Sequence, residues 1–379
     1  MSNRLTAAIG IDASRAVIAQ RTGTEHYSAS LLRALAELPE ARDRAVVLYV
    51  NLENTRQAQE RLRFALPETW RVRAIPFPRL WTHVRLSAEM VMRRPGVLFV
   101  PSHVVPLLHP RKTVITVHDL GYFVYPQAHT RLSRFYLRVS TWFSVRSAKR
   151  VIAISRATKR DLVKYYGVPT GKVRVVYHGC DPVFKPVRDE KTLEDVAARY
   201  GVGRPYCLHV GTLQPRKNLG MLVEAWRLLR ERMEQPPMLL LAGKRGWLYE
   251  SLFEQVQRAE LEELVKFADY VDRDDLPALY SRALALAFPS LYEGFGLPPL
   301  EAMSCGTPVI CSNATSLPEV VGDAGIVLDP TDVEAWADAV QSIAENADER
   351  ERLSQRGLAQ AKQFTWERCA RETWDVLSK

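Results

Sequence analysis

Two short segments in the second half of the chain place charged side chains beside glycine turns. The first, GTLQPRKN at residues 211–218, has Gly211 for a tight turn and brings Arg216 and Lys217 to the start of a predicted helix. Two cations beside the positive end of a helix suit a diphosphate. The segment lacks the G-x-x-x-x-G-K-[ST] pattern of a P-loop. A solvated basic loop is the alternative interpretation of these residues alone.

The second segment, YEGFGLPPLE at residues 292–301, carries two carboxylates eight residues apart, Glu293 and Glu301. Between them, residues 294–296 read Gly-Phe-Gly, and Pro298 stands early in a predicted helix. Backbone amides at such a helix start can bind phosphate or sugar oxygens, and carboxylates accept hydrogen bonds from sugar hydroxyls. Either glutamate alone could be a helix cap or a surface residue. The whole segment at residues 292–301 is therefore a more specific signal for a phosphate or sugar site than either glutamate alone.

Apolar runs alternate with amphipathic segments along the whole chain, which indicates the elements that position these residues. The strand-like runs are residues 5–12, 44–50, 96–101, 112–119, 150–155, 173–179, 205–212, 237–244, 264–271, 284–290, 308–313 and 324–329. The helices predicted between them include Glu25–Leu38, Arg131–Lys149, Ser155–Tyr166, Leu219–Met233 and Asp332–Ala344. This alternation predicts an α/β fold with doubly wound parallel sheets. In such sheets ligands bind at the carboxyl ends of strands, where both charged segments lie.

The alternation is interrupted once, by the proline-containing and charged stretch DPVFKPVRDEK at residues 181–191. A chain of 379 residues also exceeds what one hydrophobic core usually organises. We therefore expect two Rossmann-like domains, at residues 1–182 and 190–362. Residues 363–379 are expected to form a helix that packs back toward the N-terminal domain.

Composition favours a globular protein of the cytoplasm. Hydrophobic residues make up 47% of the chain and charged residues 25%, which is ordinary for a globular domain. The first residues lack the apolar region of a secretory signal, and no apolar run approaches the ~18 residues of a membrane span. The five cysteines are scattered and show no C-x-x-C spacing, so neither a disulfide framework nor a zinc site is indicated.

The two charged segments resemble motifs of a known family. EGFGLPPLE resembles the E-x7-E motif of the family 4 glycosyltransferases, a retaining family with the GT-B fold. GTLQPRKN resembles the phosphate-binding segment upstream of that motif, and residues 305–332 are similar to its usual continuation. The resemblance covers nearly all of the second domain, with its motifs in the family's order. It implies two Rossmann-like domains that face a shared cleft.

The same resemblance implies the roles of the donor-site residues. Arg216 and Lys217 would bind the donor diphosphate, Glu293 the hydroxyls of the transferred sugar and Glu301 the ribose. The base would lie near Tyr270. The other donor-binding residues implied by the family pattern are Gly211, Val271, Gly294, Phe295, Gly296 and Leu297.

In the first domain the resemblance is weaker and rests on strand ends. His118 stands near the end of the run at 112–119, just after its apolar residues, and a family histidine there contacts the sugar near the reaction centre. Gly23 corresponds to the family's glycine loop, although threonines flank it where many members have a second glycine. Asp119, Ser155 and Arg156 also follow strands and are candidate acceptor contacts.

These resemblances imply an enzyme, a retaining hexosyltransferase that needs neither a metal nor another cofactor. No D-x-D stands in a loop suited to a divalent ion, and the acceptor would attack from the face that the leaving phosphate vacates, without a covalent nucleophile. The sequences of the motifs are similar to those of bacterial mannosyltransferases, and this similarity favours GDP-mannose as the donor. UDP-glucose and dTDP-rhamnose stay open. The expected acceptor is a saccharide or lipid-linked glycan of envelope polysaccharide or glycolipid synthesis.

Other classes of protein agree less well with the sequence. An epimerase of the same fold should show extra acid and base groups, and a phosphorylase would be longer and carry a lysine for pyridoxal phosphate. A dinucleotide oxidoreductase needs G-x-G-x-x-G after its first strand, where this chain has GIDASR. A non-catalytic polyanion-binding protein would use the basic half, but no nucleic-acid-binding motif accompanies that charge, so no nucleic-acid partner is expected.

Charge is distributed unevenly along the chain. Residues 1–180 contain 29 lysines and arginines and 11 acidic residues, a net +18, whereas the remainder has a net −9. This asymmetry predicts an anionic partner for the first half, although chance surface charge is an alternative.

The predicted helix at Arg131–Lys149 concentrates this basic character. An apolar stripe at helical spacing accompanies its arginines, and consists of Leu132, Phe135, Tyr136, Val139, Trp142 and Phe143. Such a stripe is more often core than a contact surface. The cations beside it indicate peripheral attachment to an anionic membrane, on its inner face, as the competing interpretation.

Overall fold

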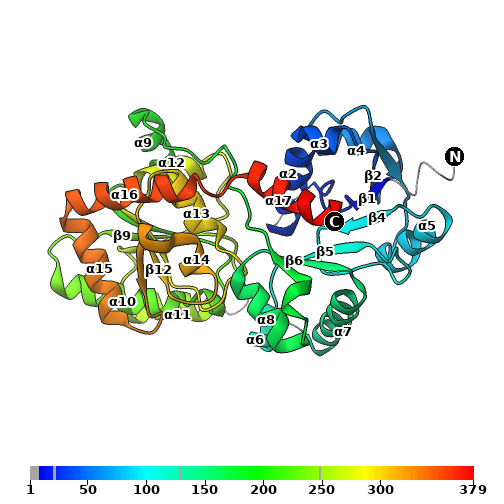
Figure 1. The fold of residues 1–379 in the computed structure, drawn as a ribbon. Helices are drawn as coiled ribbons and strands as arrows, with labels where there is room; N and C mark the ends of the chain where they lie inside the picture. The colour runs from blue at the N-terminus through cyan, green and yellow to red at the C-terminus, as the bar shows by residue number, and fades with distance from the viewer. Residues whose placement is uncertain (1–7, 20–22, 129, 247–248) are drawn as a thin grey trace. The chain divides into compact units, whose positions relative to one another are not determined.

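The computed structural model describes residues 8–19, 23–128, 130–246 and 249–379. The chain divides into two compact units (Figure 1). Unit 1 comprises residues 1–179 together with 365–379, and unit 2 comprises residues 180–364. The last helix therefore belongs to the same unit as the start of the chain.

Unit 1 is built on a seven-stranded sheet in the order β3-β2-β1-β4-β5-β6-β7, with parallel pairing throughout. The strands are β1 Ile9–Asp12, β2 Val46–Val50, β3 Trp70–Ala74, β4 Val97–Val100, β5 Thr113–Val117, β6 Arg150–Ala153 and β7 Val173–Val175. The central strands are buried along nearly their whole length, because helices cover a doubly wound sheet on both faces. The strand order reverses between β1 and β4, which is where such sheets bind ligands.

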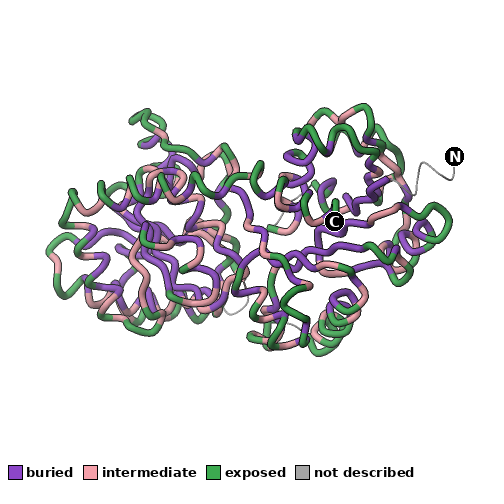
Figure 2. Tube along the Cα trace, viewed as in Figure 1, coloured by how far each residue is buried: buried purple, intermediate pink, exposed green. Residues whose placement is uncertain are grey.

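The helices of unit 1 alternate with its strands. They are α2 Gly23–Glu37, α3 Pro39–Arg42, α4 Thr55–Leu62, η1 Thr82–Leu86, α5 Ser87–Met92, α6 Gly121–Val124, η2 Pro126–Ala128, α7 Arg131–Ser147, α8 Arg156–Tyr166, η3 Thr170–Lys172 and α17 Trp366–Ser378. Helix α17 packs against α2, and its Trp374 and Leu377 join the core formed by α2 and β1. Figure 2 shows this core as the buried part of the trace.

Unit 2 repeats the architecture with six parallel strands in the order β10-β9-β8-β11-β12-β13. Its strands are β8 Tyr206–Val210, β9 Met238–Ala242, β10 Val265–Asp269, β11 Ala285–Phe288, β12 Val309–Ser312 and β13 Ile326–Leu328. Its helices are α9 Glu190–Arg199, η4 Pro215–Lys217, α10 Leu219–Arg232, α11 Tyr249–Arg258, α12 Leu276–Arg282, α13 Leu297–Ser304, α14 Leu317–Val321, η5 Gly322–Ala324, α15 Val333–Glu345 and α16 Ala347–Ala361. The reversal point lies between β8 and β11.

The predicted α/β class with two Rossmann-like sheets and a helical tail is confirmed. Every strand-like run of the sequence contains a strand, although residues 5–7 of the first run lie outside the described residues. The sequence prediction missed the edge strand β3, where Arg71 and Arg73 interrupt the apolar pattern, and the short helix α4. Within the described ranges, no helix is long and apolar enough to cross a membrane.

Candidate active site

The two charged segments of the sequence meet at the reversal point of the unit 2 sheet. Strands β8 and β11 are neighbours, with Leu208 paired to Leu286. The loop after β8 carries Arg216 and Lys217 in η4, and the loop after β11 carries Glu293. Parallel strands end on the same edge of the sheet, so residues 76 positions apart in sequence become neighbours.

Glu293 holds both predicted phosphate-binding cations. Its Oε1 atom lies 2.5 Å from the Lys217 ammonium and 3.1 Å from the Arg216 guanidinium, and accepts a 2.6 Å hydrogen bond from the Ser290 hydroxyl. Arg216 also donates to the Tyr292 carbonyl at 2.8 Å. The Lys217 and Glu293 side chains are only 6% and 12% exposed, so this pairing takes place largely away from water.

The electrostatics of the cluster keep Glu293 ionised. Burial alone would raise the pKa of this carboxyl, but Lys217, Arg216 and the hydrogen bonds from Lys217 and Ser290 lower it to about 2. Burial lowers the pKa of Lys217, and the Glu293 carboxylate opposes that shift. A ligand anion that binds here therefore competes with Glu293 for the two cations.

His209 is a buried neighbour of this cluster that the sequence analysis did not identify. Its Nδ1 lies 3.0 Å from the Ala287 carbonyl, so Nδ1 carries the proton and Nε2 is an acceptor. Nε2 is buried and has no hydrogen-bond partner among the described residues. The imidazole stacks on Phe288, over whose ring the Lys217 ammonium also lies at 4.7 Å. Burial, followed by the charge of Lys217, lowers the pKa of His209 to about 3.

Beyond Glu293, the chain turns sharply into α13. Gly296 has a φ of +110°, and a Cβ there would lie 2.7 Å from a Leu317 methyl, so glycine is required. The hydroxyl of Ser316 donates to the carbonyls of Glu293 and Phe295 and fixes the loop. Gly294 and Leu297 complete the turn at the start of α13, whose first amides face the same edge of the sheet as η4.

Glu301 lies on α13 in a separate group of contacts. The Tyr280 hydroxyl donates to its carboxylate at 3.1 Å. Burial raises the pKa of Glu301 to about 7, opposed by the nearby Arg273 and by the Tyr280 hydrogen bond. Arg273 is itself paired with Asp181 at 2.8 Å. The spacing of the sequence did not reveal Arg273, Tyr280 or Asp181, because they come from distant parts of the chain.

The residues predicted near the base follow β10. Tyr270 is 60% exposed, and the Lys244 ammonium lies 5.2 Å from its ring centroid. Val271 is buried. Gly211 and Gly243, at the ends of β8 and β9, both have positive φ, and a Cβ on Gly243 would lie 1.9 Å from the Gly211 carbonyl oxygen. This close backbone contact shapes the loop that precedes Arg216.

In unit 1, His118 follows β5 at the corresponding edge of the sheet. Its Nε2 donates to the Pro101 carbonyl at 3.1 Å, which leaves Nδ1 as an acceptor. Burial lowers the pKa of His118, so the imidazole is neutral. The Tyr27 and His178 rings pack against it.

Further polar residues gather around His118 that the sequence analysis did not name. His103 follows β4, and burial, followed by the neighbouring His118, lowers its pKa to about 4. Asp12 ends β1 and is buried, which raises its pKa. Arg15 pairs with Glu25 of α2 at 2.8 Å. The signal for His103 and Asp12 was present, since His103 comes shortly after the predicted strand at 96–101 and Asp12 is the last residue of the predicted strand at 5–12.

The other predicted residues of unit 1 have mixed surroundings. Gly23 is exposed and begins α2, while Arg21 and Thr22 lie outside the described residues. Asp119 is exposed and accepts from the Gly121 amide at 2.9 Å. Ser155 is fully buried, and its hydroxyl caps α8 by accepting from the Thr158 amide. Capping of α8 is a structural role for Ser155, which the sequence analysis named as a candidate acceptor contact. Arg156 is exposed at the first position of α8.

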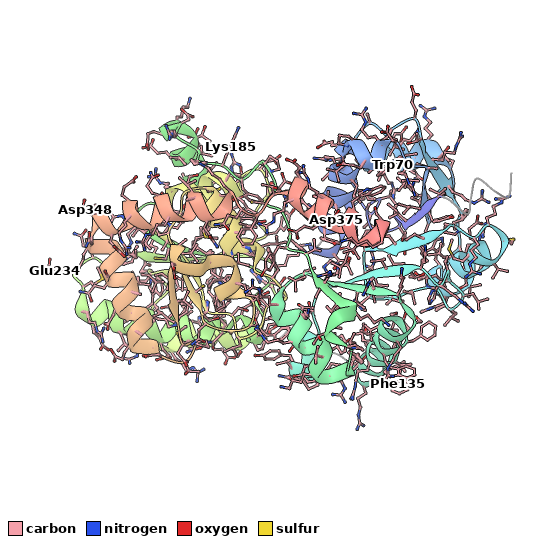
Figure 3. The ribbon with its side chains drawn as sticks, in the orientation of Figure 1. Trp70, Phe135, Lys185, Glu234, Asp348 and Asp375 are labelled. Carbon is pink, nitrogen blue, oxygen red and sulfur yellow. The ribbon has the colours of Figure 1, made fainter. Side chains whose placement is uncertain are left out.

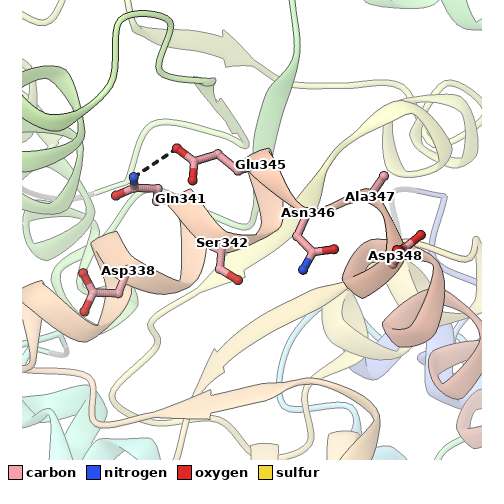
Figure 4. Close-up of a pocket in the computed structure, with 7 residues that line it drawn as sticks. All are labelled: Asp338, Gln341, Ser342, Glu345, Asn346, Ala347 and Asp348. Carbon is pink, nitrogen blue, oxygen red and sulfur yellow. Dashed lines mark hydrogen bonds between the residues drawn. The ribbon is translucent and has the colours of Figure 1, made fainter.

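A hollow of about 640 Å³ lies elsewhere in unit 2, where α15 ends and α16 begins (Figure 4). Its lining includes Asp338, Glu345 and Asp348 and none of the predicted donor residues. In the close-up, Gln341 donates to Glu345 across the last turn of α15. Three carboxylates in an open hollow repel a diphosphate, so this is not the donor site. Across the described residues, no group of three His, Cys, Asp or Glu side chains is arranged to hold a metal ion.

Comparison with known proteins agrees with this geometry. Residues 21–184 match the family described as Glycosyltransferase Family 4, and residues 194–360 match Glycosyl transferases group 1. The O-antigen chain mannosyltransferase B of Escherichia coli is 39% identical over 264 residues, which cover 69% of each chain. The chain is a family 4 glycosyltransferase. The chain is also similar to the O-antigen chain mannosyltransferase RfbU of Salmonella typhimurium, 28% identical over 342 residues, which cover 86% of this chain and 88% of the relative.

Solved structures give the same fold for this family 4 glycosyltransferase. Sucrose-phosphate synthase from Thermosynechococcus elongatus superimposes with a TM-score of 0.73 at 22% identity, covering 97% and 98% of the two chains. Anabaena HepE, determined with UDP-glucose, also gives a TM-score of 0.73, at 21% identity and covering 98% and 99%. The predicted GT-B fold is therefore confirmed, and so is the prediction of a glycosyltransferase.

Proposed function

We propose that this glycosyltransferase moves mannose from GDP-mannose to a saccharide or lipid-linked acceptor in the synthesis of an envelope polysaccharide. The observation that carries the proposal is the Lys217–Glu293–Arg216 cluster at the reversal point of the unit 2 sheet. The choice of mannose is supported by the mannosyltransferases to which the chain is similar.

The cluster suits the charges that sugar transfer creates. When the bond between the anomeric carbon and the diphosphate oxygen breaks, negative charge develops on the diphosphate and positive charge on the sugar. Arg216 and Lys217 are placed to stabilise the first charge. Glu293, released from one or both cations, is then placed to accept hydrogen bonds from sugar hydroxyls. Glu301 would hold the ribose from the second turn of α13.

We propose that transfer retains the anomeric configuration and needs no metal ion. The acceptor oxygen would form its bond to the anomeric carbon on the face that the diphosphate leaves, and its proton would pass to the departing phosphate oxygen. Two fixed cations supply the charge that a divalent ion would otherwise provide. We assign no covalent nucleophile, because the proposed role of Glu293 is to accept hydrogen bonds from the sugar hydroxyls once the phosphates have taken its place on the two cations.

A panel of nucleotide sugars tests the proposal. Purified protein is incubated with GDP-mannose, UDP-glucose and dTDP-rhamnose without acceptor, and slow release of the free nucleotide is followed. We expect GDP release from GDP-mannose to exceed release from the other donors at least tenfold. Faster release from another donor would correct the sugar, and conversion of a donor to its epimer would favour an epimerase instead.

We propose that the enzyme works at the inner face of a membrane, where a lipid-linked glycan is presented, and that the polar residues around His118 bind the acceptor. This group of side chains offers both donors and acceptors of hydrogen bonds to a sugar, and consists of Arg15, Glu25, Asp119, His103 and His118.

A further inference from the structure

Helix α7 buries a mainly hydroxyl-bearing face and exposes most of its large apolar side chains, whereas a surface helix usually buries its apolar face. Its buried residues are Ser140, Thr141, Ser144 and Val145, three of them hydroxyl-bearing. Most of its large apolar side chains are exposed, and Phe135 projects outward in Figure 3, whereas Leu137 and Phe143 pack against the core of unit 1. The exposed fractions are 78% for Leu132, 66% for Phe135, 45% for Tyr136, 47% for Val139 and 49% for Trp142. Five of the six residues of the predicted stripe are therefore exposed, and only Phe143 packs against the core, so the more usual interpretation of such a pattern is wrong for most of the stripe.

Hydrogen bonds fix the helix in this orientation. The Ser144 hydroxyl donates to the Ser140 carbonyl at 2.7 Å and accepts from the Val105 amide at 3.2 Å. The Tyr166 hydroxyl donates to the Arg138 carbonyl at 3.1 Å. The Ser144 hydroxyl and the Arg138 carbonyl thus bind groups outside α7, and rotation of the stripe inward would break these hydrogen bonds.

Neighbouring segments extend the exposed apolar area. Helix η1 with the loop that precedes it, helix α5 and the loop before β5 contribute exposed side chains, namely Leu80, Val84, Val91, Met92, Leu107 and Leu108. Contacts join these segments to α7: His83 hydrogen-bonds the Tyr136 hydroxyl at 2.8 Å, and the His109 ring packs against Phe143. The Leu108 amide donates to Ser87 of α5. We call the exposed apolar residues of α7 and these segments, with their arginines, the α7 surface.

The charge of this region is almost entirely positive. Residues 69–160 contain 17 lysines and arginines and only two acidic residues, Glu89 and Asp119. Glu89 is buried and paired with Arg73 and Arg85, so it contributes no exposed negative charge. Helix α7 itself contains four arginines and no carboxylate. An exposed apolar stripe bordered by cations matches the anionic headgroups and acyl chains of a membrane surface.

We propose that the α7 surface binds an anionic lipid bilayer, with the apolar side chains at the level of the acyl chains and the arginines on the headgroups. A second copy of the chain is a poorer occupant. A twofold contact through this face would bring arginines against arginines, at an unfavourable Coulomb energy. The inference deepens the proposed work at a membrane but does not depend on the sugar that is transferred.

Vesicle sedimentation tests the proposal with the full chain. Vesicles of phosphatidylcholine alone are compared with vesicles that also contain phosphatidylglycerol, at low and at raised salt. We expect most of the protein to sediment with the anionic vesicles at low salt, and little with the neutral ones. Raised salt should release it, because headgroup attraction is screened beyond a Debye length of about 10 Å at 0.1 M.

Two triple variants separate charge from apolar contact. Arg131→Glu/Arg134→Glu/Arg138→Glu reverses the charge of the α7 surface, and Leu132→Ser/Phe135→Ser/Trp142→Ser removes apolar area without changing charge. Each should lower vesicle binding at least tenfold. The matched control reverses three exposed arginines of unit 2, Arg188→Glu/Arg204→Glu/Arg258→Glu, and should bind within about twofold of the wild type.

Release of nucleotide from the donor is measured on every variant, so that loss of folding and failure of the proposed enzyme activity are recognised separately. Variants that release nucleotide normally but no longer sediment would support the proposal. It would be overturned if the wild type stays in the supernatant with anionic vesicles. Equal losses in the α7 and control variants would also overturn it, as would a wild-type dimer that the serine variant dissociates.

Discussion

The Lys217 ammonium lies 2.5 Å from Oε1 of Glu293, and the Arg216 guanidinium lies 3.1 Å from the same oxygen. One carboxylate oxygen thus occupies both cations that the proposed mechanism requires for the donor diphosphate. When the donor binds, a phosphate must replace the Glu293 carboxylate on the two cations. This exchange couples the glutamate proposed to bind the sugar to the residues proposed to bind the phosphates.

Glu293→Gln should separate transfer from nucleotide binding. Removing the charge frees Lys217 and Arg216, so affinity for GDP should be unchanged or higher, whereas transfer should fall by about a hundredfold, or ~3 kcal/mol. Titration calorimetry with GDP and the rate of donor turnover give the two quantities. Glu301→Ala is the comparison, because it should weaken GDP binding itself. Equal losses of GDP affinity in both variants would contradict this division of roles.

Donor affinity should rise with pH through the pKa of Glu301, near 7. Only the carboxylate can accept from both ribose hydroxyls, so binding should strengthen about tenfold between pH 6 and pH 8. The same raised pKa makes the folded protein less stable as pH rises from 4.5 to 7, since the unfolded chain gives up this proton first. Calorimetry with GDP-mannose, whose doubly esterified diphosphate does not titrate in this range, should show that the donor affinity of the wild type rises with pH. If the affinity of Glu301→Gln rises with pH in the same way, a group other than Glu301 is responsible.

Gly243→Ala should destabilise unit 2. The added Cβ would lie 1.9 Å from the Gly211 carbonyl oxygen at a φ of +156°, which together should cost ~2 kcal/mol or more. Gly203→Ala is the matched control, because a Cβ there meets nothing within 4 Å. Thermal denaturation should show a lower midpoint for Gly243→Ala only. Equal midpoints for the two variants would mean that the β8 and β9 loops move apart without strain.

Turnover should survive an excess of EDTA, because Arg216 and Lys217 supply the positive charge at the diphosphate. Donor hydrolysis is measured before and after chelation, and again after added magnesium or manganese. Loss of activity that either ion restores would show that a metal takes part.

The fold was predictable largely because its strands are buried. Runs such as residues 238–242 are continuously apolar, as expected where helices cover both faces of a sheet, and β9 lies there. The edge strand β3 escaped prediction because Arg71 and Arg73 give it a polar pattern. The orientation of α7 was also not predictable, since periodicity shows that a stripe exists and not which face is buried.

The sequence indicated candidate site residues that follow predicted strands, and did not indicate residues that only packing brings to them. Arg216, Lys217 and Glu293 follow two strands that the fold makes neighbours. Nothing near Glu301 in sequence indicates that burial raises its pKa or that Arg273 and Tyr280 oppose this shift, because packing alone brings these groups together.

The most direct test of the account compares GDP release from GDP-mannose by the wild type with release by Arg216→Ala and by Lys217→Ala. Removal of one fixed cation from the diphosphate site should lower the rate about a hundredfold in each variant, equivalent to ~3 kcal/mol of transition-state stabilisation. Circular dichroism and the thermal midpoint establish that both variants are folded. If both are folded and release GDP at rates near the wild type, the assignment of these cations to the donor diphosphate is wrong.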